Sequence, residues 1–356
     1  MPKLVPTLVL LLCLSSGLAG QVPAGYYDSA SGLTGKALQQ ALHDIIDGHT
    51  PLEYSDLWQC YSTTDIKADG VTVWDIYSDK PGGTPAYTYM IFTEQCGTYQ
   101  KEGDCYNREH SFPKSWFNDA LPMYTDLFHI YPTDGWVNNK RGNLPYGETA
   151  GATWTSTNGS MVGPSSVQGY SGNVFEPIDE YKGDLARTYF YIATRYYGED
   201  SQWPGSDMTA GAQPKTWAVP MLLAWHLADV VSAKEISRNN EVYKYQGNRN
   251  PFIDDPQFAE KIWGTLNPVQ EIEENRISVT LYPNPAQYWL NVSIPGHRCS
   301  GTVAYVYDTA GCLVQTATVD DGFASVSTAG LPAGMYFLTL TCDGKVATAT
   351  FVVTGR

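Results

Sequence analysis

Asn107-Arg108-Glu109-His110-Ser111-Phe112-Pro113 is the stretch of sequence that decides how this chain folds around its chemistry. A second polar cluster, Val137-Asn138-Asn139-Lys140-Arg141-Gly142-Asn143, begins about thirty residues later. Adjacent residues on an extended strand point to opposite faces of the sheet. Glu109 and His110 can therefore serve one site only if a strand bends or ends at that point, and the nearby Pro113 is consistent with an end.

The two clusters together supply a carboxylate, an imidazole, a carboxamide and a guanidinium. Metal-assisted hydrolysis of a phosphodiester needs such a set. A hard cation takes oxygen ligands, the attacking water needs a base, and the charge that develops on the phosphate needs a cation nearby. The sequence therefore predicts a hydrolytic metal site built from both clusters.

Three separated motifs resemble, in the same order, those of the secreted bacterial endonuclease I family: Cys105–Ser115, Asp126–Pro132 and Asn138–Asn143. The run Gln246–Phe252 resembles the end of the same family domain, so the resemblance covers roughly residues 30 to 264. It implies an α+β fold, in which a mixed helical catalytic domain surrounds a ββα-metal core. The implied activity is hydrolysis of DNA without sequence specificity, with RNA left open as a substrate.

The resemblance also implies where the elements of that core begin and end. The first strand would end at Glu109 and His110, and the second would hold Asp126 to Tyr131. The helix would begin near Thr133 or Asp134, either of which can cap a helix. Asn138 would then lie about one turn inside the helix.

Each role in the site is carried over onto a single residue. The resemblance implies that Glu109 and Asn138 bind the metal and that His110 is the general base, since a neutral imidazole can take a proton from water near pH 7. Two protein ligands leave positions for water and phosphate, as Mg²⁺ prefers, with Mn²⁺ or Ca²⁺ as alternative occupants. Arg141 is predicted to act in catalysis, where it contacts a phosphate or clamps Asp126.

The residues that hold the substrate are less well defined by the sequence. Four are predicted to bind it: Arg141, Asn143, Lys114 and Arg249. His129 and Asn107 are expected to be structural or to assist the site. Some family members steady the product phosphate with an arginine in a long insertion, but here the 15 residues between His110 and Asp126 contain no arginine. The sequence does not choose among its possible replacements, which are Lys114, Arg141, Arg187 and Arg249.

The charge balance limits how nucleic acid could bind. The formal net charge is -15, from 37 acidic and 22 basic residues, which argues against binding nucleic acid through a broad basic surface. We therefore expect weak, metal-dependent substrate binding. One alternative is a secreted glycan- or surface-binding protein without nuclease activity, favoured by aromatic residues in predicted loops (Trp154, Tyr170 and Trp203). Another is a phosphodiesterase or phosphatase with small substrates.

The chain is predicted to contain a signal peptide and two domains. Residues 1–20 combine Lys3, the apolar run Leu4–Leu14 and small residues before a cut, which is typical of a secretory signal. The catalytic domain is predicted at 21–268, an acidic linker at 269–280 and a small all-β, Ig-like sandwich at 281–356. The segments Tyr282–Pro285 and Leu331–Tyr336 resemble the sorting domain of type IX-secreted proteins. The resemblance implies export to the medium or cell surface, with the secretion machinery as a partner, and we expect a monomer without a membrane span.

Six cysteines remain after the predicted signal: Cys60, Cys96, Cys105, Cys299, Cys312 and Cys342. Export makes disulfides permissible. Cys96 and Cys105 bracket a glycine-containing loop just before the Glu-His pair, so we predict that they are bridged and that Cys60 is free and buried. If pairing stays within each half of the chain, one of the last three cysteines is also left over.

Periodicity predicts the main secondary-structure elements. Helices are expected at 33–47, at 184–197 and at 214–233, where Pro220 should kink the helix or mark its true start. Strands are expected at 71–77 and 87–92, and a Gly/Ser/Thr-rich surface loop at 147–172. In the second domain, alternating residues predict strands at 290–294, 303–307, 335–341 and 348–353.

Overall fold

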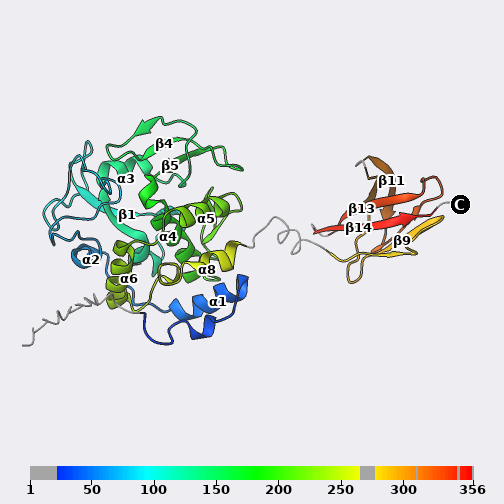
Figure 1. Cartoon of the computed structure of the whole chain (residues 1–356), viewed down its shortest axis with the longest axis horizontal. Coiled ribbons are helices and arrows are strands. Elements are labelled where there is room, and N and C mark those ends of the chain that lie inside the picture. The colour runs from blue at the N-terminus through cyan, green and yellow to red at the C-terminus, as the bar shows by residue number, and fades with distance from the viewer. Residues whose placement is uncertain (1–21, 265–276, 310–311, 343–344, 355–356) are drawn as a thin grey trace, which may run out of the picture. The chain divides into compact units, whose positions relative to one another are not determined.

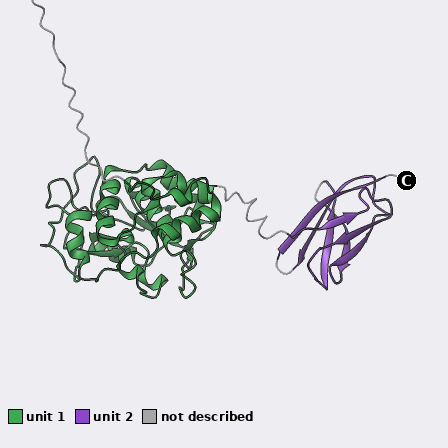
Figure 2. Ribbon diagram, turned by 90° about the horizontal axis from the view of Figure 1, so that it is seen from below, with its two compact units in different colours: residues 1–264 green, residues 265–356 purple. Residues whose placement is uncertain are grey.

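The computed structural model describes residues 22–264, 277–309, 312–342 and 345–354 (Figure 1). The chain divides into two compact units, residues 1–264 and 265–356 (Figure 2). The predicted signal peptide and most of the predicted linker lie outside the described residues, so the exact domain boundaries remain predictions. Within the described ranges, no helix has both the length and the apolar character needed to cross a membrane.

The first unit is built around one buried helix, α4 (Lys182–Arg195), every residue of which is buried. It packs against neighbouring helices that include α1, α5 and α7. Figure 1 shows α4 near the middle of this unit. The other α-helices described in this unit are α1 (Gly35–Ile46), α2 (Leu57–Thr64), α3 (Gly135–Arg141), α5 (Ala218–Ala228), α6 (Ala233–Gln246), α7 (Pro251–Asp254) and α8 (Gln257–Ala259).

The helices that were predicted from periodicity are confirmed. The predicted helix at 33–47 is α1, which buries Leu38, Leu42 and Ile46 as expected, and the predicted helix at 184–197 is α4. Pro220 lies in the first turn of α5, where its missing N–H costs no helical hydrogen bond. It therefore marks the start of that helix, which is one of the two predicted alternatives. Helix α5 is shorter at both ends than the predicted 214–233, and α6 was not predicted.

The predicted strands at 71–77 and 87–92 are wrong. These segments form only isolated bridges, such as Thr72 with Met90. The Asp69 carboxylate accepts hydrogen bonds from the backbone N–H groups of Val71 and Thr72, and Asp75 accepts one from Tyr77. Side chains thus capture the backbone donors that a sheet would need.

The predicted loop at 147–172 is also partly wrong, because it contains strands β3 (Trp154–Thr155) and β4 (Met161–Pro164). Together with β5 (Asn173–Glu176) they form an antiparallel sheet in the order β3-β4-β5. A short hairpin of β6 (Thr209–Ala210) and β7 (Gln213–Pro214) completes the strands described in this unit.

Strands β1 (Tyr106–His110) and β2 (Ile130–Asp134) form the antiparallel pair that carries the predicted motifs. Glu109 is paired with Tyr131 and His110 with Ile130. The first strand ends at His110, as predicted. The second begins later than predicted, because Asp126 caps a short 3₁₀ turn at Leu127–His129 by accepting a hydrogen bond from the Phe128 N–H.

Helix α3 follows β2 without a loop and completes a ββα unit. Its N-cap is Asp134, whose side chain accepts a hydrogen bond from the Val137 N–H at 2.8 Å. Of the two predicted capping residues, Thr133 and Asp134, it is therefore Asp134 that caps the helix. The predicted Cys96–Cys105 disulfide is present directly before β1, and Cys60 is free and buried, as predicted.

The second unit is an antiparallel β-sandwich. One sheet has the order β12-β9-β8, made of Phe323–Ser327, Trp289–Ser293 and Thr280–Tyr282. The other has the order β11-β10-β13-β14, made of Leu313–Val319, Thr302–Tyr307, Gly334–Cys342 and Lys345–Val353. Leu290, Val306 and Leu338 are buried in its core.

The predicted strands of the second unit are confirmed as β9, β10, β13 and β14, whereas β8, β11 and β12 were not predicted. A Cys299–Cys342 disulfide leaves Cys312 free and exposed. The helical first unit and the all-β second unit confirm the predicted α+β class.

Candidate active site

A polar pocket of about 470 Å³ lies where β1 ends beside α3. Six residues that were predicted from the sequence line it: Asn107, Glu109, His110, Lys114, Asn138 and Asn143. The remaining lining residues are Tyr54, Tyr99, Arg108, Pro113, Ser115, Asp119, Asn139 and Gly142. The structure thus brings together the two sequence clusters, as the strand-end argument requires.

Glu109 has one carboxylate oxygen engaged and one open. Its side chain is almost fully buried, and Oε1 accepts hydrogen bonds from the Tyr77 hydroxyl at 2.9 Å and from Arg141 Nη1 at 3.1 Å. Oε2 accepts none from the described residues. Burial raises the pKa of Glu109 to about 7, although Arg141 and Tyr77 act in the opposite direction. A further positive charge at this carboxylate would therefore be favourable.

His110 is held in one tautomer by the backbone. Its Nε2 lies 3.1 Å from the carbonyl oxygen of Tyr124, which can only accept a hydrogen bond. Nε2 therefore carries the proton, and Nδ1 is the nitrogen with a free lone pair. Burial, and then the neighbouring His129, lower the pKa of His110 well below its ordinary value. The imidazole is thus neutral near pH 7 and can accept a proton.

Asn138 lies one turn inside α3, where it was predicted. Its side chain lines the pocket and makes no hydrogen bond to any other part of the described chain. Gly142, with a φ of +54°, ends the helix, and Asn143 follows it on the pocket wall. Asn138 can therefore offer its amide oxygen to a ligand in the pocket without breaking an existing contact.

The structure corrects the placement of Arg141. Its side chain is only 1 % exposed and does not line the pocket. Nη1 donates to Glu109 and to the carbonyl of His110, and Nη2 donates to the carbonyl of Ser111. The guanidinium neither clamps Asp126 nor reaches a ligand in the pocket, and instead ties α3 to the end of β1.

Two other predicted residues also lie outside the pocket. His129 is fully buried, and its Nε2 bonds to the carbonyl of Met123 at 2.7 Å, which fits the structural alternative. Arg249 is buried and forms an ion pair with Asp254 at 2.6 Å, so the structure does not bring it to the pocket with the other predicted substrate ligands.

The cations that the sequence left open lie in different surroundings. Arg187 is buried in an ion pair with Glu235 and does not reach the pocket. Lys114 is the only one of the four candidates that lines the pocket, with its side chain 45 % exposed and 3.3 Å from Asp119. A phosphate could approach Lys114 without displacing a buried ion pair.

Arg108 and Tyr54 belong to the pocket but were not predicted as ligands. The guanidinium of Arg108 lies 3.6 Å from the centre of the Tyr54 ring, and Nη1 donates to the Tyr54 carbonyl. Arg108 Nε is buried and has no partner in the described chain. Its position inside the Glu-His motif could have identified it, whereas Tyr54 lies far upstream and carries no local signal.

Residues 34–257 match the family model described as Endonuclease I. This match covers more than half of the chain. The chain belongs to the endonuclease I family. Residues 280–354 match a second family, described as a secretion system C-terminal sorting domain.

Three relatives of this endonuclease I family member are themselves named as nucleases. An extracellular ribonuclease of Bacillus amyloliquefaciens is 37% identical over 248 residues, which is 67% of this chain and 78% of that protein. An extracellular ribonuclease of Bacillus subtilis (strain 168) is 35% identical over the same shares. Endonuclease-1 of Buchnera aphidicola subsp. Baizongia pistaciae (strain Bp) is 30% identical over 129 residues, or 36% of this chain and 46% of that protein.

Together these findings make the chain a hydrolytic nuclease that is secreted or held at the cell surface. Its substrate is nucleic acid, and its sorting domain makes the secretion machinery a partner. The alternatives of a binding protein without nuclease activity and of a small-ester phosphatase are not supported by the family match.

A second candidate metal site of this endonuclease I family member lies outside the pocket. The side chains of His43, Asp47 and Glu199 offer ligand atoms within 4.8 Å of one another. Arg195 Nη1 already pairs with Asp47 at 2.9 Å and with Glu199 at 2.8 Å. A metal at this cluster would therefore have to compete with the Arg195 guanidinium, which already contacts both carboxylates.

Proposed function

We propose that this protein is a metal-dependent endonuclease that hydrolyses phosphodiester bonds of DNA and RNA without sequence specificity. The observation that carries the proposal is the pocket at the end of β1, which gathers Glu109, His110 and Asn138. Base-reading elements are not needed for such an activity, because contacts to phosphate and sugar carry no sequence information.

The pocket fits a single hard cation. The Glu109 carboxylate has an oxygen without a hydrogen bond in the described chain, and the Asn138 amide is likewise free. Both are oxygen donors, which suits Mg²⁺, with Mn²⁺ or Ca²⁺ as alternatives. When bound, the ion would supply positive charge that stabilises the phosphorane and the departing oxygen.

His110 is proposed as the general base. Its Nε2–H is bonded to the Tyr124 carbonyl, so Nδ1 would take the proton of the attacking water. The burial that lowers its pKa keeps this nitrogen unprotonated near pH 7. The rings of Tyr54 and Tyr124 lie stacked against the imidazole, with centroids 6.0 and 5.4 Å away, and limit its rotation.

Lys114 and Arg108 are proposed to hold the phosphate, and Asn143 and Asn107 to contact its oxygens or the sugar. Both cations line the pocket, and Arg108 is fixed by its stacking on Tyr54 and Trp58. Arg141 is proposed to act indirectly, as a positioning residue that orients Glu109.

RNA is included in the proposal because two relatives that align over 67% of this chain are named extracellular ribonucleases. DNA is included because the family itself is described as Endonuclease I. The aromatic side chain of Tyr99, which also lines the pocket, would offer a face for an unpaired base of either polymer.

The test is cleavage of plasmid DNA and of a structured RNA by the signal-free chain, with Mg²⁺ and with EDTA. We expect nicking and linearisation of the plasmid, and internal cuts in the RNA, only with the metal. His110→Ala should abolish both, while His297→Ala, in the second unit, should change neither. Cleavage that persists in EDTA or in the His110→Ala variant would refute the proposed mechanism.

A further inference from the structure

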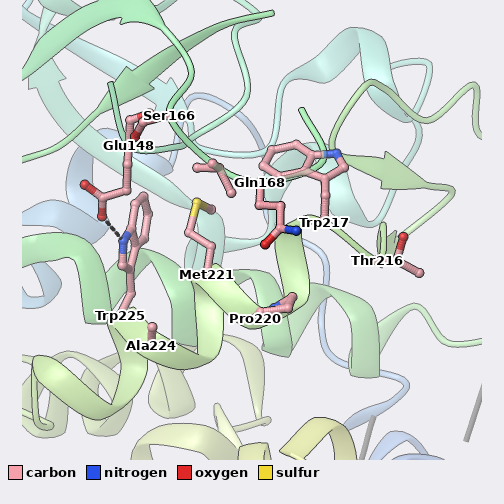
Figure 3. Close-up of a pocket in the computed structure, with 10 residues that line it drawn as sticks. Glu148, Ser166, Gln168, Thr216, Trp217, Pro220, Met221, Ala224 and Trp225 are labelled. Carbon is pink, nitrogen blue, oxygen red and sulfur yellow. Dashed lines mark hydrogen bonds between the residues drawn. The ribbon is translucent and has the colours of Figure 1, made fainter. Parts of the chain in front are cut away.

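A second pocket, of about 500 Å³, lies over α5 and shares no lining residue with the candidate active site. Pro220, Met221, Ala224 and Trp225 form its α5 side, and the segment 166–168 faces them (Figure 3). Glu148, Thr216 and Trp217 complete the lining. The volume lies within the range of small-ligand sites, about 300 to 1,000 Å³.

Two indole rings in this pocket are held in place before any ligand arrives. Trp217 stacks on Tyr170, with ring centres 4.6 Å apart and planes 9° apart, and its Nε1 donates to the Asp207 carbonyl. The Nε1 of the buried Trp225 donates to Glu148 Oε1. Figure 3 shows Met221 between the two indoles. A preorganised apolar floor of this kind suits a flat ring, because little side-chain freedom is lost on binding.

The polar side chains of the pocket include both donors and acceptors. Gln168 and Thr216 are exposed, and their side chains make no hydrogen bond within the described chain. Ser166 donates its hydroxyl hydrogen to the Glu148 carbonyl and keeps its lone pairs. A ligand whose groups both donate and accept, such as a row of hydroxyls, matches this mixture. A phosphate only accepts hydrogen bonds and would use only the donors of the pocket. An ammonium only donates them and would use only the acceptors.

The charge around the pocket argues against a nucleic-acid ligand. The Lys182 ammonium is shared by three carboxylates, those of Glu148, Glu176 and Asp179, at 2.9, 2.9 and 2.7 Å. Among the described residues that line the pocket, Glu148 alone is charged, so a phosphodiester would meet a carboxylate there and no cation. The active-site pocket, by contrast, presents Lys114 and Arg108.

We propose that this second pocket binds a neutral oligosaccharide. A sugar ring has an apolar C–H face, which would lie on Trp217 and Met221, and a rim of hydroxyls that would bond with Gln168, Thr216 and the Glu148 carboxylate. Such a site would hold the secreted enzyme on a polysaccharide while the separate active site remains free.

The test is calorimetric titration of the signal-free chain with three neutral probes: cellotetraose, mannotetraose and chitotetraose. We expect saturable binding of at least one. Trp217→Ala should weaken it at least tenfold and leave nuclease activity unchanged. The matched control Trp289→Ala removes an exposed indole from the second unit and should change neither. Gln168→Ala removes an exposed side chain without internal bonds, so it tests the rim even if Trp217→Ala fails to fold.

Three outcomes would overturn the proposal. One is that none of the three tetrasaccharides binds, and another is that binding is unchanged in both Trp217→Ala and Gln168→Ala. The third is that an oligothymidylate binds and Trp217→Ala abolishes that binding, which would make the pocket a nucleobase site. Loss of nuclease activity in His110→Ala, with saccharide binding retained, would confirm that the two sites are independent.

Discussion

Arg141 is the residue whose environment differs most from its predicted role. The guanidinium is buried with Glu109, so Arg141→Met would leave a carboxylate in the interior without its cation. We expect the free energy of unfolding to fall by about 3 to 5 kcal/mol, the usual cost of breaking a buried pair. Denaturant unfolding measures this directly.

Two further variants separate charge from packing at this position. Lys140→Met, one residue earlier on α3, removes an equal charge that is not buried and should cost little. Adding Glu109→Gln to Arg141→Met should restore part of the loss, because no unpaired charge then remains. An unchanged unfolding free energy in Arg141→Met alone would contradict the proposed role.

Lys114 and Arg249 give a contrasting prediction about substrate binding. Lys114 lines the pocket in a solvent-exposed ion pair, whereas Arg249 is buried with Asp254. Lys114→Ala should raise KM for nucleic acid by about fivefold, since an exposed ionic contact contributes at most about 1 kcal/mol. Arg249→Ala should lower the melting temperature and leave KM unchanged. Steady-state kinetics that showed the reverse would make Arg249 the phosphate ligand.

The sequence predicted Glu109, His110 and Asn138 together because their motifs are local, and the pocket brings all three to one place. It could not predict that Arg141 is buried. That burial depends on residues distant in sequence such as Tyr77, whose hydroxyl donates to the same Glu109 oxygen that Arg141 binds. The sequence therefore predicted the residues that lie in short motifs. It did not predict burial that arises from contacts between residues distant in sequence.

At the scale of elements, apolar residues that recur about every 3.6 residues identified α1 and α4. Such a pattern is readable because these helices pack their apolar side chains into the core. The strand pattern at 71–77 was misleading. The side chains of Asp69 and Asp75 accept hydrogen bonds from backbone N–H groups that a strand would use for pairing. The alternation of apolar residues does not reveal these side-chain hydrogen bonds. The short strands β3 and β4 were missed because their Gly/Ser/Thr-rich composition is typical of loops.

Asp75 links this irregular segment to α3 and makes the junction sensitive to pH. Its Oδ2 accepts a hydrogen bond from the Asp134 N–H, at the start of α3. Burial, with a contribution from the charge of Asp134, raises the pKa of Asp75 to about 7. Between the ordinary Asp pKa and this value, the folded state holds a proton that the unfolded state has released.

The free energy of unfolding should therefore fall as pH rises from about 4 to about 7, with up to about 1.4 kcal/mol per pH unit from this one group. Asp75→Asn should flatten that slope, even though it lowers stability overall by losing one acceptor. Asp44→Asn, on the exposed face of α1, is the control. Parallel slopes for all three proteins in guanidinium unfolding would show that Asp75 does not titrate in this range.

For the molecule as a whole, the net charge of -15 is compatible with a nuclease because only a few cations, located at the pocket, are needed to bind the phosphate. Lys114 and Arg108 lie at the pocket, and the proposed metal would add the remaining positive charge. Affinity for nucleic acid should thus depend on the metal more than on the bulk surface, which is what the composition predicted.

The two units carry different parts of the function, and their cores share no residue. Residues 265–356 form a unit of their own that contains the sorting-domain match, while the candidate active site lies wholly in the first unit.

A chain that ends at residue 268 should therefore fold and cleave nucleic acid with the kcat of the full chain, but it should remain in the cell. Activity measured separately in the medium and in cell lysates tests both parts, with the full-length chain as the control for export. If the shortened chain is unfolded by circular dichroism, the predicted domain boundary is wrong. If it is folded, active and still exported, the second unit is not what directs the protein out of the cell.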